Sequence, residues 1–364
     1  MPAATGPQTA MKSPDATRAT ISSPHDTEVA EKIQYRLDHL TKPRGSLGRL
    51  EEIVMQYGLA RGTAKIEMPR KALFVFCADH GIAAEGVSAY PQDVTHQMVL
   101  NFASGGAAIN VLCRQHDIDP VIVDMGVNHA FEPGKAIVNR KIAPGTRNFL
   151  HEPAMSREQA VRSVEAGMAL ANAAAHLKYG LLAVGEMGIA NTTSSSAIAA
   201  AISGRPASEL VGAGTGVSEE QQKHKAAVIT QAIERHRPDA KDPLAVLAAV
   251  GGFEIGGICG FLLGAAAARV PVVVDGFIAS AGALLAAGLA PAVRDYIFLS
   301  HESAEPGHKV MAELLQVRPL LSLEMRLGEG TGAALAMGLI DSALRLYREM
   351  ATFESASVSN RSRA

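Results

Sequence analysis

The sequence predicts an α/β fold in which parallel strands form a sheet with helices on both faces. Three observations support this prediction. Six short apolar runs, several of them rich in Val or Ile, have the composition of strands covered on both faces. One or more helical segments separate each run from the next, which is typical of parallel strands joined by right-handed crossovers. Polar residues and glycines follow each run, as at the ligand-binding edge of such sheets.

The six runs are the candidate strands of the large domain. In chain order they cover residues 72–77, 120–124, 181–184, 270–274, 295–299 and 320–323. Each has the length of a short strand, and the segments between them are long enough for the helical crossovers that parallel pairing requires.

The helical segments at the two ends of the chain have no strand runs beside them. Residues 28–40 and 47–59 have the pattern of amphipathic helices, and residues 331–350 form a long helix. We expect residues 27–65 and 331–354 to build a small helical-bundle domain, and residues 66–330 the large α/β domain. Residues 1–26, rich in Ala, Thr, Pro and Ser, are expected to be a disordered tail, as are residues 355–364.

Composition argues against several classes of function. The net charge is -2 and aromatic residues make up 4% of the chain, whereas nucleic-acid binding normally needs a basic face and stacking side chains. Cys77, Cys113 and Cys259 form no CxxC pair, so we expect no disulfide framework and a cytoplasmic location. Residues 276–293 are uncharged but rich in Gly and Ala and contain Pro291, which favours buried helices over a membrane span.

The loops after the runs carry the residues suited to chemistry. Because the carboxyl ends of parallel strands meet at one edge of the sheet, we expect these loops to form a single composite site. Their polar residues are Asp79 and His80 after the first run, Glu186 after the third, Asp275 after the fourth, His301 and Glu302 after the fifth, and Glu329 after the sixth.

A glycine-dense loop at residues 212–216 precedes a helix expected at residues 218–235. Exposed backbone N–H groups at a helix start suit an anion such as phosphate, and Lys225 could reach the same anion. The loop is neither a Rossmann fingerprint, because Val217 stands where a glycine would be needed, nor a Walker A motif. A plain turn and a solvated lysine remain the alternatives.

Two glutamates are candidate catalytic acids. Glu186 directly follows a buried strand, so its carboxylate needs a pocket or a partner. Glu329 lies between Gly328 and Gly330, which leave room for a substrate, and in a partly apolar pocket it could act as a general base. The alternative for Glu329 is an acid that simply favours the start of the following helix, and Asn191 or Thr192 could likewise only cap a helix.

The histidines do not predict a metal site. His80, His96, His301 and His308 are in no Cys/His cluster and in no H-E-x-x-H motif, so no metal is expected. A serine hydrolase is also disfavoured, because no G-x-S-x-G motif occurs. An NAD(P)-dependent oxidoreductase would need G-x-G-x-x-G near the first strand, and residues 78–81 do not supply it. A non-catalytic nucleotide-binding protein would use the same phosphate loops without needing Glu329.

In several segments the sequence resembles the nicotinate-nucleotide–dimethylbenzimidazole phosphoribosyltransferase family. The resemblance runs from about residue 41 to residue 350, and the order of its motifs makes it specific. The matching segments are KPRGSLG at 42–48, ADHG at 78–81, EGVSAYP at 85–91, GEMGIANTT at 185–193, GGFEI at 251–255, SH at 300–301, EPGH at 305–308 and MRLGEGTG at 325–332.

The resemblance implies a Rossmann-like parallel six-stranded sheet, a small helical domain made from both chain ends, and a homodimer whose partner helps cover each site. It implies transfer of phosphoribose from nicotinate mononucleotide to 5,6-dimethylbenzimidazole, which yields α-ribazole 5′-phosphate for the lower ligand of cobalamin. The same reaction with another azole, a purine or a phenolic base is the alternative. No cofactor, metal, nucleic acid or membrane is implied.

The resemblance also implies roles for individual residues. Glu329 matches the general base, and Glu186 matches a second acid that stabilises positive charge at the sugar. The expected phosphate- and ribose-binding residues are Gly188, Asn191, Thr192, Thr193, Gly214, Thr215, Gly216, Lys225, Gly328 and Gly330. The expected slot for the flat base is lined by Ser88, Tyr90, Pro91, Met98 and Leu327.

Overall fold

A parallel sheet of six strands forms the centre of the fold. The computed structural model describes residues 14–212 and 218–359 of the chain. The strands lie in the order β3-β2-β1-β4-β5-β6, and every neighbouring pair is parallel. This is the doubly wound order in which the chain starts at the middle of the sheet and reverses direction between β1 and β4. The predicted α/β class with a Rossmann-like parallel sheet is confirmed.

Five of the six predicted strands lie in this sheet. The sheet strands are β1 (Arg70–Ala78), β2 (Asp119–Gly126), β3 (Ile137–Asn139), β4 (Tyr179–Met187), β5 (Val272–Val274) and β6 (Ile297–Leu299). The sixth predicted strand, at residues 320–323, does form a strand, but its expected place in this sheet is wrong. That segment contributes only β8 (Leu321–Ser322), which pairs with β7 (His301–Glu302) in a separate two-stranded sheet.

The missing sixth strand is β3, and its pattern explains why it was not predicted. It has only three residues, none of them buried, and it pairs with β2 at the edge of the sheet. An edge strand this short carries no apolar run that would separate it from a loop.

The central strands bury both faces, so the sheet has a hydrophobic core on each side. Phe74 and Phe76 of β1 belong to one core, whereas Leu73 and Val75 belong to the other. This alternation follows from the strand geometry, in which successive side chains point to opposite faces. Both faces must therefore be covered by helices.

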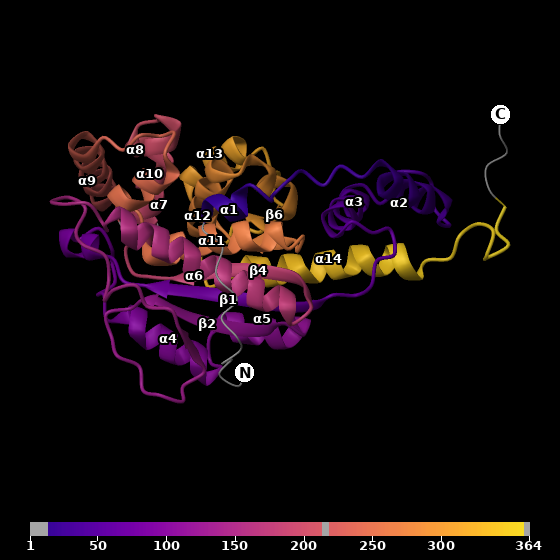
Figure 1. The fold of residues 1–364 in the computed structure, drawn as a ribbon, viewed down its shortest axis with the longest axis horizontal. Coiled ribbons are helices and arrows are strands. Elements are labelled where there is room, and N and C mark those ends of the chain that lie inside the picture. Colours follow the sequence, from indigo (N-terminus) through magenta and orange to yellow (C-terminus); the bar gives the residue numbers. More distant parts are fainter. Residues whose placement is uncertain (1–13, 213–217, 360–364) are drawn as a thin grey trace.

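Figure 1 shows these two helical layers, with α4 and α5 on one side of the central strands and α6, α7 and α10–α13 on the other. The first layer has α4 (Val94–Ser104), α5 (Ala108–His116) and α14 (Thr331–Glu349), with η1 (Gly81–Glu85) in the loop before α4. The second layer has α6 (Arg157–His176), α7 (Asn191–Ser203), α8 (Ala207–Leu210), α9 (Glu219–His236), α10 (Pro243–Val250), α11 (Phe253–Ala267), α12 (Phe277–Leu289), η2 (Pro291–Tyr296) and α13 (Pro306–Leu315).

Helices from the two ends of the chain pack together, as the sequence predicted. They are α2 (Thr27–His39), α3 (Arg49–Arg61) and α14, and the Arg36 side chain of α2 donates to the backbone oxygen of Tyr347 at 2.6 Å. However, Met337 and Ile340 of α14 share a core with Leu73 of β1. The helical bundle and the sheet therefore have a continuous core, and their division into two domains stays a prediction.

Part of the segment expected to be a tail is ordered. Residues 14–18 form a short helix, α1 (Pro14–Arg18), in which Thr17 is buried. The Tyr296 hydroxyl donates to the backbone oxygen of Ser22 at 3.0 Å, which fixes the segment that follows α1. The expected tail over residues 1–26 is therefore wrong from residue 14 onward, because packing orders a segment whose own composition specifies little.

No helix within residues 14–212 and 218–359 has both the length and the apolar character that crossing a membrane requires.

Glycines allow α6 and α11 to approach each other closely. A Cβ atom added at Gly260 would lie 1.8 Å from the backbone oxygen of Val164, and one at Gly167 would lie 1.9 Å from that of Gly257. Distances this short are not compatible with any side chain, so the helix backbones are in direct contact. This layer depends on glycine at both positions.

We predict that Gly260→Ala destabilises the protein by about 2 kcal/mol or more, because alanine collides with α6. The effect opposes helix propensity, which alone would favour alanine by about 1 kcal/mol. Chemical denaturation followed by circular dichroism measures the change. As a control, Asn172→Ala on the exposed side of α6 should change stability by less than about 0.5 kcal/mol. Equal stability of the two variants would contradict the packing argument.

Candidate active site

Two strand-end loops meet at the topological switch point of the sheet. A Cβ atom added at Gly185 in β4 would lie 2.3 Å from the backbone nitrogen of Gly330, and one at Gly328 would lie 2.5 Å from Oε1 of Glu186. The loop at residues 328–330 therefore packs directly on the end of β4. This contact brings the two predicted catalytic acids, Glu186 and Glu329, into one site.

Asp275 fixes the loop that carries Glu329. It lies directly after β5 and is buried, and its Oδ2 accepts from Gly330 N at 3.1 Å while Oδ1 accepts from Ala333 N at 3.0 Å. These N–H groups belong to the start of α14, where unpaired donors favour a negative charge. The sequence placed Asp275 at the sheet edge but gave it no role.

Glu329 has a backbone conformation that its neighbours impose. Its φ is +64°, between Gly328 at +84° and Gly330 at +90°, in the left-handed region that side-chain-bearing residues seldom adopt. Its Oε2 accepts from Ile109 N at 3.5 Å, in the first turn of α5. Burial raises the pKa of Glu329, the Ile109 bond opposes this, and the negative charge of Asp275 adds to the rise.

Glu186 is a buried acid whose carboxylate is held by the start of α7. Its Oε2 accepts from the side-chain amide of Asn191, in the first turn of α7. Burial raises the pKa of Glu186 to about 8, the Asn191 bond opposes the rise, and the charges of Glu254, Asp275 and Glu329 reinforce it. In the free protein Glu186 is therefore mostly protonated at neutral pH.

A buried lysine reaches the same helix start. Lys225 of α9 is 1% exposed, and its Nζ donates to Oγ1 of Thr192 at 2.7 Å. Burial lowers the pKa of Lys225 to about 8, and the charge of Glu305 opposes this. In the same turn, Oγ1 of Thr193 has no hydrogen-bond partner among the described residues. A cation beside a helix N-terminus suits an anionic group of a ligand.

The predicted glycine-rich phosphate loop is only partly described. Gly214, Thr215 and Gly216 lie outside the described residues, so the structure neither supports nor opposes their role. Gly188 is explained by packing, because a Cβ atom there would lie 2.4 Å from the backbone oxygen of Ala78. Gly188 therefore serves the contact between β1 and the β4–α7 loop, whatever its role toward a ligand.

The predicted base slot is open on its solvent side. Tyr90 is 51% exposed and Leu327 is 59% exposed, and Pro91 is also exposed. Met98 of α4 is partly buried and packs against the core beneath it, whereas Ser88 accepts a hydrogen bond from Tyr90 N at 3.3 Å. Among the described residues, no hydrogen bond or ion pair joins these five side chains to Glu329, so the slot stays a prediction.

His301 and His308 of the sequence analysis are buried and have hydrogen-bond partners. Nδ1 of His301 lies 2.9 Å from Oγ of Ser300, and His308 Nδ1 accepts from Ser303 N at 3.2 Å. Burial lowers the pKa of His308 to about 4, so it is neutral at physiological pH. Within the described ranges, no group of three or more His, Cys, Asp or Glu residues is placed to hold a metal.

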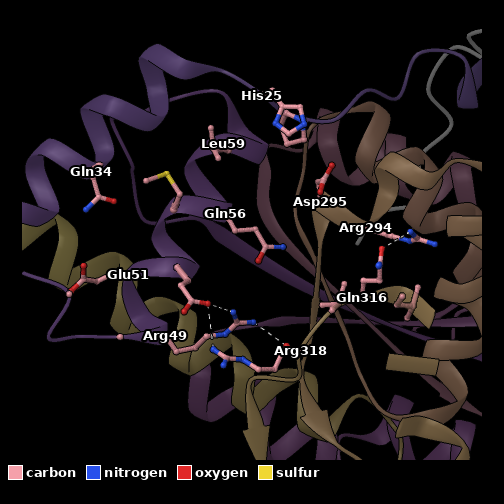
Figure 2. Close-up of a pocket in the computed structure, with 17 residues that line it drawn as sticks. His25, Gln34, Arg49, Glu51, Gln56, Leu59, Arg294, Asp295, Gln316 and Arg318 are labelled. Atoms are coloured by element: carbon pink, nitrogen blue, oxygen red, sulfur yellow. Dashed lines mark hydrogen bonds and ion pairs between the residues drawn. The ribbon is translucent and has the colours of Figure 1, made fainter. Parts of the chain in front are cut away.

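Figure 2 shows a cavity formed by other residues, with a volume of about 850 Å³. It is lined by α3, η2 and the end of α13, including Arg49, Arg294 and Arg318. The Gln56 side chain in its wall donates to the backbone oxygen of Ile297, the first residue of β6. None of the predicted site residues lines this cavity, so it is not the place where the acids meet.

Comparison with known proteins identifies close relatives. A family model described as phosphoribosyltransferase matches residues 22–358. Nicotinate-nucleotide–dimethylbenzimidazole phosphoribosyltransferase of Chlorobaculum tepidum is 52% identical over 338 residues, covering 93% of this chain and 96% of the relative. The protein of the same name from Geobacter sp. strain M21 is 50% identical, covering 93% and 97%. The crystal structure of CobT from Thermus thermophilus superposes with a TM-score of 0.88 at 46% identity, covering 92% and 100%.

We predict that Glu186→Gln gains stability relative to the unchanged protein as the pH rises. An unfolded glutamate titrates near pH 4.5, whereas the pKa of Glu186 is about 8 in the fold. The unfolded chain therefore ionises first, and the stability due to neutral Glu186 is complete below about pH 4.5 and is lost up to about pH 8. Glutamine has no proton to lose.

The measurement is the difference in melting temperature between variant and unchanged protein at pH 5, 6.5 and 8. We expect this difference to shift in favour of the variant across the series. Glu302→Gln, at an exposed position, should give a constant difference. A difference for Glu186→Gln that does not change with pH would contradict the raised pKa.

Proposed function

This chain belongs to the nicotinate-nucleotide–dimethylbenzimidazole phosphoribosyltransferase family, and we propose that Glu329 is the general base of its reaction. The enzyme transfers phosphoribose from nicotinate mononucleotide to 5,6-dimethylbenzimidazole and releases nicotinate. One azole nitrogen forms a bond to the anomeric carbon while the bond to the pyridinium nitrogen breaks, and nicotinate leaves with that electron pair. The other azole nitrogen must lose its proton.

The observation that carries the proposal is the contact between the Glu329 loop and Glu186. Glu329 is buried just before α14 with its carboxylate against the start of α5, and its raised pKa makes it a stronger base than an ordinary glutamate. A base whose pKa is closer to the working pH takes a proton more effectively. Its left-handed backbone between two glycines fixes where the carboxylate points.

Glu186 is suited to the positive charge of the donor. Nicotinate mononucleotide carries a cationic pyridinium ring, and positive charge develops on the ribose as that ring leaves. This charge beside Glu186 would lower its pKa from about 8 and favour the carboxylate, which then stabilises the transition state. Attack from the face opposite the leaving ring converts the β-nucleotide into an α-nucleotide.

Lys225 and the first turn of α7 are suited to the donor's 5′-phosphate. The Lys225 ammonium already lies at Thr192 Oγ1, and Asn191 and Thr193 belong to the same turn. A dianionic phosphate there would restore the lowered pKa of Lys225 by direct charge pairing. We include Gly214, Thr215 and Gly216 in this phosphate site on the family resemblance. Phosphate binding far from the reacting carbon positions that carbon for attack.

We predict that Glu329→Gln lowers turnover about 100-fold or more, because glutamine cannot accept the azole proton. The assay incubates enzyme with nicotinate mononucleotide and 5,6-dimethylbenzimidazole and measures nicotinate by chromatography. Glu324→Gln, an exposed acid in the same segment, is the matched control and should keep normal turnover. Equal rates for Glu329→Gln and the unchanged enzyme would refute the base, and no turnover with any azole, purine or phenol would refute the activity.

We further propose that two copies of the chain form a dimer in the cytoplasm. Tyr90, Leu323 and Leu327 are each about half exposed, and exposed apolar side chains favour contact with a partner. Cys77, Cys113 and Cys259 are free and buried, which suits a reducing compartment.

We predict a particle of twice the 38.1 kDa chain mass in light scattering at micromolar concentration. Leu327→Glu should shift the distribution toward single chains, because a charge would be buried in the interface. A single-chain mass for the unchanged protein over this concentration range would refute the dimer.

A further inference from the structure

Three buried polar side chains form a hydrogen-bonded chain beneath the candidate site. His80 Nε2 lies 2.6 Å from Oε1 of Glu254, and His80 Nδ1 lies 2.9 Å from Oγ of Ser194. All three side chains have 0% exposure. His80 follows β1, Ser194 lies in the first part of α7, and Glu254 lies in the first turn of α11, so the chain joins three separate elements.

Two glycines hold the imidazole ring between them. A Cβ atom added at Gly252 would lie 2.4 Å from Cε1 of His80, and one at Gly188 would lie 3.4 Å from Cδ2 of His80. Gly188 belongs to the β4–α7 loop, and Gly252 is the N-cap of α11. The ring thus contacts the segments on both sides of it, and its orientation is fixed by packing as well as by hydrogen bonds.

The arrangement of Ser, His and Glu resembles a hydrolase triad in composition, but its burial excludes that chemistry. A nucleophile must reach a substrate carbonyl, and Ser194 has no exposed surface. These hydrogen bonds therefore have a role within the protein, where they hold its own elements in place. The proton positions that satisfy these bonds are an N–H at Nε2, which donates to the Glu254 carboxylate, and an unprotonated Nδ1, which accepts from the Ser194 hydroxyl.

The hydrogen bonds of His80 support one part of the site, namely the start of α7. Ser194 is three residues after Asn191, which donates to Glu186, and two residues after Thr192, which accepts from Lys225. Glu329 is held by other contacts, through Ile109 and through the Asp275 bonds to Gly330 and Ala333. The two halves of the site therefore have separate supports.

We propose that His80, supported by Glu254, is a positioning residue that fixes the α7 start for the phosphoribosyl donor through its bond to Ser194. This inference rests on the proposed function in that the donor is nicotinate mononucleotide. A buried imidazole suits the task because its two nitrogens form hydrogen bonds in fixed, opposite directions. The Glu254 carboxylate is fully buried, so it requires such a donor, and its other oxygen has no partner among the described residues.

The test compares variants that break one bond at a time. Ser194→Ala removes the hydroxyl. In His80→Gln the side-chain amide reaches the position of Nε2 and keeps the Glu254 bond but not the Ser194 bond, whereas in His80→Asn it reaches the position of Nδ1 and keeps the Ser194 bond. Ser195→Ala is the matched control, because Ser195 is an equally buried serine of the same helix whose Oγ has no partner among the described residues.

We expect Ser194→Ala and His80→Gln each to raise KM for nicotinate mononucleotide roughly 5- to 10-fold, the scale of one lost hydrogen bond, with KM for 5,6-dimethylbenzimidazole unchanged. The double variant should be no worse than either single variant, because both remove the same bond. His80→Asn should retain a KM closer to that of the unchanged enzyme, and Ser195→Ala should match it. Melting temperatures confirm that each variant is folded.

The outcomes separate this inference from the proposed function. Unchanged KM values with lowered melting temperatures would show a purely structural role and overturn the inference while the activity stands. Equal effects on both substrates, or additive effects in the double variant, would also overturn it. Calorimetric titration with nicotinate mononucleotide gives the dissociation constant without turnover. If the unchanged protein shows no transfer activity but binds the nucleotide, the same pattern across the variants supports the inference, and its absence refutes it.

Discussion

The architecture of the site depends on one close backbone contact, between β4 and the loop that begins α14. No side chain fits at Gly185, because the backbone of Glu329 and Gly330 occupies that space. This contact joins a strand at the middle of the sheet to the C-terminal helix, whose other end packs with the N-terminal helices. The ends of the chain are thereby tied to the switch point of the sheet, and two acids distant in sequence face one site.

The charges around this contact divide into two regions. Glu186, Asp275 and Glu329 have neutral donors as hydrogen-bond partners, namely the Asn191 amide and backbone N–H groups. Among the described residues, none of these three acids forms an ion pair with a basic side chain, and burial raises the pKa of each. Neighbouring acids add to this rise at Glu186 and Glu329, whereas the charge of His301 opposes it at Asp275. Lys225 supplies positive charge at the start of α7. A ligand with a cationic ring and an anionic phosphate fits this division, since each end meets the opposite charge.

The sequence predicted those structural features that depend only on residues close together in the chain. The long buried strands β1 and β4 and the polar residues that follow them were predicted, because apolar runs and sheet-edge loops are local features. The edge strand β3 was not, since its three half-exposed residues resemble a loop. The roles of Asp275 and His80 were also missed. Each depends on a partner more than 50 residues away, and only the folded sheet determines which partners meet.

Glycine meets two different physical requirements in this protein, one in the core and one in the site. Between α6 and α11, glycines let two backbones touch, and the benefit is packing. At residues 328–330 the sequence suggested that glycines leave space for a substrate. The structure adds a different requirement, because Gly328 and Gly330 have φ values of +84° and +90° and any Cβ at Gly328 would strike Glu186. These glycines therefore set the path of the loop that carries Glu329 and its contact with Glu186, so replacing them would change the geometry of the two acids even where a substrate would still fit.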